Sequence, residues 1–154
     1  MSYEEKGTWL FLWTTIAGYA AYIVRVVGRA DGVALEKVDY ERTLLWSIGF
    51  VIAANIVGRI ALAIFGEVAV QVRSARTGVE QPSDDHNMDV RDKEINRFGE
   101  YVGGIVLGTA MIVPFGLALG EVEHFWIANA MYMAFVLSGL VSASIKLVAY
   151  RRGF

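Results

Sequence analysis

Four apolar stretches, each long enough to cross a lipid bilayer, constrain this chain more than any other feature. They run without a charged residue over 7–24, 43–58, 101–120 and 125–145, and the second resumes after Arg59. About 20 apolar residues, at ~1.5 Å each, cover the ~30 Å hydrocarbon core of a bilayer. The pattern predicts an all-α, polytopic membrane protein whose four transmembrane helices form two antiparallel hairpins.

The boundaries of these stretches predict a single transmembrane domain with little mass outside the membrane. The one long connection, residues 73–97, lies between the two hairpins and carries most of the charge. The N-terminal segment has acidic residues where a signal peptide would be basic, so we expect the first helix to be retained. We expect the spans at about residues 8–28, 43–66, 99–120 and 125–147.

The lysines and arginines predict how the hairpins are oriented. Nine of them lie in the two terminal segments and the long connection, four lie on the opposite side, and the last is Arg59. Cytoplasmic segments carry the excess of positive charge. We therefore expect both termini and the connection in the cytoplasm. The nine are Lys6, Arg73, Arg76, Arg91, Lys93, Arg97, Lys146, Arg151 and Arg152, and the four are Arg25, Arg29, Lys37 and Arg42.

The composition argues against several classes of function. A net charge of −2 without a basic patch gives no case for a nucleic-acid partner, and the absence of cysteine excludes thiolate chemistry. Asp85, Asn87 and Asp89 have the spacing of an EF-hand loop, but Val90 stands where that loop requires glycine. We predict no metal, no cofactor and no catalytic residue, and an enzyme is the least favoured class.

Small residues mark where helices can approach closely in lipid. The third apolar stretch is richest in them, with Gly99, Gly103, Gly104 and Gly108 at the spacing of one helical turn, and with Pro114 further on. Packing inside one four-helix bundle explains the glycines most simply. A homo-oligomer that uses part of this surface is the alternative, and we expect an oligomer.

Polar side chains recur inside the spans at the three-to-four spacing of a helix face. If these faces converge, they form a polar seam or a ligand-binding site through the bundle. The alternative is that the hydroxyls bond to backbone carbonyls and the long cations extend to the headgroups. The candidates for the seam are Tyr22, Arg25, Asn55, Arg59, Tyr132, Ser142 and Lys146.

Arg59 indicates a functional site more strongly than the other residues do, because a charged group inside a membrane needs a partner. None of the charge-free stretches contains an Asp or Glu, and the nearest candidates are Glu67 and Glu100. If the span runs to Gly66, Arg59 lies about seven residues, or ~10–12 Å, from its cytoplasmic end. With Asn55 one turn away, we expect it to face protein rather than lipid.

The element Asp89-x-Arg91-Asp92-x-x-Ile95, just before the third span, alternates in charge. With the four-span layout it resembles a family of small uncharacterised prokaryotic membrane proteins that carry a similar D-x-R-D element. The resemblance implies a bacterial or archaeal plasma membrane and no established activity.

Two hypotheses follow from these patterns. In the first, the protein is a non-enzymatic accessory or regulatory membrane protein that docks a cytoplasmic protein through Asp89, Arg91 and Asp92. In the second, it is a small transporter or channel for an anionic or amphipathic solute, with Asn55 and Arg59 at the site. Membrane lipids are expected partners in both.

Overall fold

A computed structural model of the chain describes residues 3–30, 32–77 and 90–152. Every regular element in these ranges is helical, which confirms the predicted all-α fold. The elements are α1 (Tyr3–Ala30), the short 3-10 helix η1 (Leu35–Lys37), α2 (Glu41–Thr77), α3 (Val90–Ala110), α4 (Ile112–Leu119) and α5 (His124–Arg152).

Four helical segments are long and apolar enough to cross a membrane, as the sequence predicts. They are Tyr3–Ala30, Glu41–Val68, Val90–Leu119 and His124–Arg152. The third consists of α3 and α4, which are interrupted at Met111. Pro114 explains the interruption, because proline has no N–H to donate to the carbonyl four residues earlier, that of Ala110.

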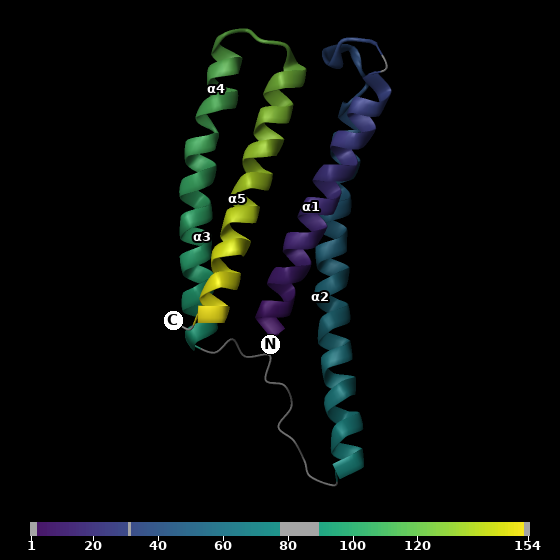
Figure 1. Ribbon diagram of the computed structural model, residues 1–154, viewed down its shortest axis with the longest axis vertical. Coiled ribbons are helices and arrows are strands. Elements are labelled where there is room, and N and C mark those ends of the chain that lie inside the picture. The colour runs from purple at the N-terminus through teal and green to yellow at the C-terminus, as the bar shows by residue number, and fades with distance from the viewer. Residues whose placement is uncertain (1–2, 31, 78–89, 153–154) are drawn as a thin grey trace.

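The helices stand side by side in the order α2, α1, α5 and α3 with α4 (Figure 1). Each hairpin is antiparallel, and the two hairpins meet where α1 packs against α5. The start of α1 and the end of α5 lie at one end of the bundle, here called the terminal end (Figure 1). The α1–α2 and α4–α5 connections lie at the other, here called the loop end.

Glycines permit the closest contacts between these helices. A Cβ atom at Gly103 of α3 would lie 2.9 Å from Cβ of Ser142 and 3.3 Å from the backbone oxygen of Ser138, both on α5. At Gly18 of α1 it would clash with the side chain of Val51 on α2. Part of the glycine surface therefore packs inside the bundle, as its spacing predicts.

The buried core lies toward the loop end, where α1 and α5 meet. Tyr22 is its centre, with 1% of its surface exposed. Its ring packs edge-on against that of Tyr132, with 5.4 Å between the centroids. The buried cluster consists of Tyr22, Val26, Phe125, Tyr132 and Val136.

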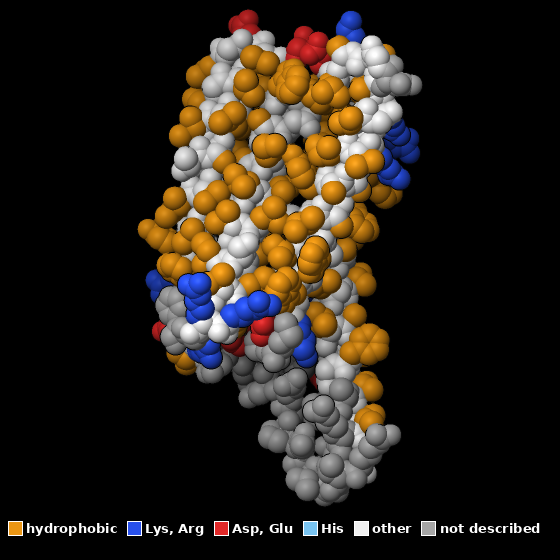
Figure 2. Space-filling view, in the orientation of Figure 1, with side chains coloured by type: hydrophobic (Ala, Val, Ile, Leu, Met, Phe, Trp, Pro, Cys, Tyr) orange, Lys and Arg blue, Asp and Glu red, His pale blue; other side chains and the backbone are white. Residues whose placement is uncertain are grey.

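Helix α2 forms one edge of the bundle and leaves most of its apolar side chains uncovered. A ridge of β-branched residues at every fourth position, Ile52, Ile56, Ile60, Ile64 and Val68, is 49–56% exposed. On the visible face, hydrophobic side chains cover the length of the helices, and charged ones gather toward the ends (Figure 2). A bilayer is the solvent that accommodates such a surface, because water would not.

Candidate functional site

The structure divides the predicted polar seam among three places. Toward the loop end, the Tyr22 hydroxyl donates a hydrogen bond to Oδ1 of Asn129 at 2.6 Å. The hydroxyls of Tyr132 and Ser47 share a hydrogen bond of 2.6 Å, and Ser47 also donates to the Gly18 carbonyl at 2.9 Å. These groups satisfy one another across α1, α2 and α5, so they connect helices rather than present polar atoms to a solute.

Asn55 connects α2 to α1 near the middle of the bundle. Its side-chain nitrogen donates to Oγ1 of Thr14 at 2.9 Å and to the Val51 carbonyl at 2.8 Å. Its side-chain oxygen is buried without a hydrogen-bond partner among the described residues. Asn55 therefore does not line the same space as Arg59, although the two are one turn apart in the sequence.

Arg25 lies far from the other cations of the predicted seam. Its exposed side chain lines a groove of about 320 Å³ between α1 and α2, together with Thr43 and Trp46. This groove belongs to the loop end of the bundle. Arg25 thus serves as a comparison for Arg59, since it is an arginine of the same hairpin at the opposite end.

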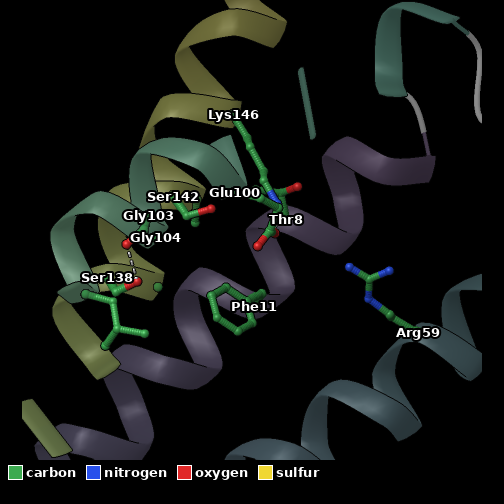
Figure 3. A pocket seen from close by; sticks show the side chains of 12 residues that line it. Thr8, Phe11, Arg59, Glu100, Gly103, Gly104, Ser138, Ser142 and Lys146 are labelled. Atoms are coloured by element: carbon green, nitrogen blue, oxygen red, sulfur yellow. Dashed lines mark hydrogen bonds and ion pairs between the residues drawn. The ribbon is translucent and has the colours of Figure 1, made fainter. Parts of the chain in front are cut away.

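The terminal end contains the candidate site, a cavity of about 340 Å³ that all four candidate spans line. It gathers Arg59, Ser142 and Lys146 from the predicted seam, and its remaining wall is made of Glu100 and of small or apolar residues (Figure 3). The lining residues are Thr8, Phe11, Arg59, Glu100, Gly103, Gly104, Leu107, Ser138, Gly139, Ser142, Ala143 and Lys146.

Lys146 and Glu100 form an ion pair on one side of this cavity. The Lys146 Nζ atom lies 2.5 Å from Oε1 of Glu100, and the two side chains are 12% and 73% exposed. The Lys146 stem crosses α3 over Gly99, where a Cβ atom would lie 2.5 Å from its Cγ. The missing side chain of Gly99 therefore lets a lysine from α5 bring its charge to the cavity.

Arg59 approaches the cavity from α2 on the other side (Figure 3). Its guanidinium carbon would lie 3.7 Å from a Cβ atom at Gly7, so it rests over the bare backbone of α1. Among the residues that the structure describes, no carboxylate lies within ion-pair distance of it. Glu100, one of the carboxylates that the sequence indicated, is bound to Lys146 instead.

Arg59 lies beside the start of α1. Its backbone oxygen accepts a hydrogen bond of 2.9 Å from the Tyr3 hydroxyl, which places it level with the charged start of α1. Helix α2 continues to Thr77, well beyond the start of α1 (Figure 1). The Arg59 side chain therefore lies at the first turns of α1, within the second candidate span, Glu41–Val68.

The predicted partner-binding residues have different surroundings. Asp89 lies outside the described residues, as does the rest of the acidic cluster at 84–89. Arg91 is exposed at the start of α3. Asp92, in the first turn of α3, is half-buried.

Neither Thr8, which lines the cavity, nor Gly7, over which Arg59 rests, is indicated as a site residue by the sequence. Thr8 and Gly7 lie in the charged-to-apolar boundary of α1, and a threonine or glycine there is ordinary. Within the described residues, no group of three or more His, Asp or Glu is placed to hold a metal ion.

No family model, no curated protein and no solved structure matches this chain.

Proposed function

We propose that this multi-pass membrane protein binds an anionic amphiphile in the cavity at its terminal end. The observation that carries the proposal is the guanidinium of Arg59, which lines this cavity and has no carboxylate partner in the described part of the chain. Guanidinium groups bind carboxylates and phosphates through two parallel hydrogen bonds. An oxyanion from a ligand would supply the missing charge.

The remaining walls of the cavity favour a ligand with an apolar part. Phe11, Leu107 and Ala143 line it beside the polar groups, and its 340 Å³ is at the small end of the ~300–1,000 Å³ of ligand pockets. A headgroup with a portion of one chain fits this mixture. Transport of such a solute is compatible with it, whereas a channel is disfavoured because the polar groups toward the loop end are bonded to one another.

The proposal predicts that Arg59→Gln weakens the binding of an anionic amphiphile about tenfold or more, since a hydrogen bond to a charged group contributes ~1.5–3 kcal/mol. The measurement is the stabilisation of the purified protein against thermal unfolding by added phosphatidylglycerol, with phosphatidylcholine as the uncharged comparison. The variant should fold normally because the Arg59 side chain is exposed.

Arg25→Gln is the matched control for this experiment. It removes an exposed arginine from the same hairpin, in a groove at the opposite end. Equal losses in the two variants would indicate attraction of anionic lipid to any positive charge and would contradict a site at Arg59.

A second candidate function is docking of a cytoplasmic protein through the start of α3. The exposed side chains of Arg91, Lys93, Glu94 and Arg97 support it, because they are available to a partner while Ile95 anchors the same turn at 0% exposure. Asp92 is a weaker candidate than Arg91, since its side chain is half-buried.

If docking occurs there, replacing Arg91 and Lys93 with alanine should remove a co-purifying protein while leaving the thermal unfolding temperature unchanged. Surface charges contribute little to folding, about 0–1 kcal/mol per pair. Arg42→Ala, at an exposed position on the other hairpin and the other end, is the control. An unchanged set of co-purifying proteins in the abundant double variant would count against this function.

We further propose that the terminal end faces the cytoplasm of a prokaryotic cell and that the protein forms a homo-oligomer. The excess of Lys and Arg in the segments at that end supports the orientation. The uncovered ridge of α2 supports contacts with another copy. The resemblance to small prokaryotic membrane proteins supports the proposal that the cell is prokaryotic.

A further inference from the structure

Three charged side chains line the described part of the cavity at the terminal end. Arg59 and Lys146 each bring one positive charge, and Glu100 brings one negative charge through its ion pair with Lys146. In the described lining, the sum is one positive charge. That charge is held by Arg59, because Lys146 is already compensated.

The position of Glu100 allows its carboxylate to repel a ligand that carries more than one negative charge, an effect here called the charge filter. Its carboxylate is 73% exposed while Lys146 is 12% exposed, so the acid lies at the solvent side of the pair. A ligand that reaches Arg59 through this cavity therefore brings its oxyanion near a fixed carboxylate. One negative charge is attracted to Arg59, whereas each additional one also meets repulsion from Glu100.

The apolar part of the cavity wall adds a second requirement, which is that the ligand has an apolar portion. Phe11 and Leu107 line the cavity, and Gly103 and Gly104 leave part of its α3 wall without side chains. An acyl chain can lie against such a surface with its oxyanion at Arg59. A small hydrophilic anion would leave this surface uncovered.

We propose that the cavity selects singly charged oxyanions attached to an acyl chain, and that Glu100 is the residue that rejects doubly charged ones. This inference rests on the proposed binding of an anionic amphiphile at Arg59. The favoured chemistry is a phosphodiester or a carboxylate, which carry one charge. A phosphomonoester is disfavoured, because its second pKa of about 6 gives it nearly two charges above neutral pH.

The test compares three probes at pH 8 on the purified full-length protein, with binding measured by native mass spectrometry. Phosphatidylglycerol supplies a phosphodiester, oleate supplies a free carboxylate, and phosphatidic acid supplies a phosphomonoester. The unmodified protein should bind at least one of the first two about fivefold or more tightly than phosphatidic acid. Tighter binding of phosphatidylglycerol assigns the site to a lipid headgroup, and tighter binding of oleate assigns it to a free fatty carboxylate.

Glu100→Gln should reverse the order, because it frees Lys146 as a second uncompensated cation and raises the charge of the lining to two. Phosphatidic acid should then bind as tightly as the best singly charged probe or more tightly. Glu94→Gln is the matched control, since it removes an exposed carboxylate from the same helix outside the cavity, and it should keep the original order.

The outcomes separate this inference from the function on which it rests. If Arg59→Gln weakens all three probes but Glu100→Gln leaves their order unchanged, the charge filter is wrong and the binding site stands. The filter is also wrong if the unmodified protein binds phosphatidic acid as tightly as the other two. If Arg59→Gln alters none of the three, the proposed function itself fails.

Discussion

Replacing Tyr22 with alanine is expected to destabilise the protein more than any other truncation in its core. The side chain is 1% exposed and stands between α1 and α5, where it packs edge-on against Tyr132. Truncation of a large buried aromatic costs ~3–5 kcal/mol in soluble proteins. We expect a cost of about 3 kcal/mol here, at the low end of that range. The van der Waals packing is lost as in a soluble protein, but the hydrophobic contribution to burial is smaller in lipid than in water.

Tyr22→Phe separates the hydrogen bond from the packing. It removes only the donor to Asn129, whose oxygen is left without that bond. Side-chain hydrogen bonds inside membrane proteins contribute ~0.6 kcal/mol on average, so most of the stability should be retained. Denaturant unfolding of both variants in the same detergent measures the two contributions.

Tyr101→Ala is the control, because Tyr101 is 67% exposed and its loss should change stability little. If Tyr22→Phe is as damaging as Tyr22→Ala, the polar contact rather than the packing holds α1 against α5. A Tyr22→Ala protein as stable as the control would show that α1 and α5 do not meet as described.

The second large effect is expected from Gly103→Val, which should separate α3 from α5. The added Cβ atom would lie 2.9 Å from Cβ of Ser142 and 3.3 Å from the Ser138 backbone, which cannot move aside as a flexible side chain can. The Ser138 hydroxyl also donates to the Gly103 carbonyl at 2.8 Å, and this bond would be lost. Overpacking of this kind costs ~1–3 kcal/mol, measurable by denaturant unfolding.

Gly104→Val is a closely matched control for stability. It makes the same change one residue away on the same helix, where an added Cβ has no atom within 4 Å. It should unfold like the unmodified protein, even though it narrows the cavity. Equal destabilisation by the two valines would mean that the contact of Gly103 with α5 does not decide the result.

Much of the fold could be predicted from the sequence because lipid imposes simple rules. Long apolar stretches must be helical to satisfy their own backbone, and short polar connections make consecutive helices antiparallel neighbours. The close packing at Gly103 followed from the same local physics. The order of the helices did not, since nothing in the stretches 7–24 and 43–58 says which one lies at the edge.

The candidate site could be predicted only in part. Arg59, Ser142 and Lys146 were chosen for their polarity, and they line one cavity. Tyr22, Arg25, Asn55 and Tyr132 were chosen by the same criterion and lie elsewhere. Helical periodicity says which face a residue occupies, but not which helix meets that face or at what height.

The sequence by itself determined that this is an all-α membrane protein with four long apolar helices and an arginine that needs a partner. The tertiary structure decided the rest. It brought Lys146 over Gly99 to Glu100 and left Arg59 beside Gly7 without a carboxylate in the described chain. The reason is physical: hydropathy is a property of each segment, whereas the charge of a cavity depends on the register of helices that only their packing sets.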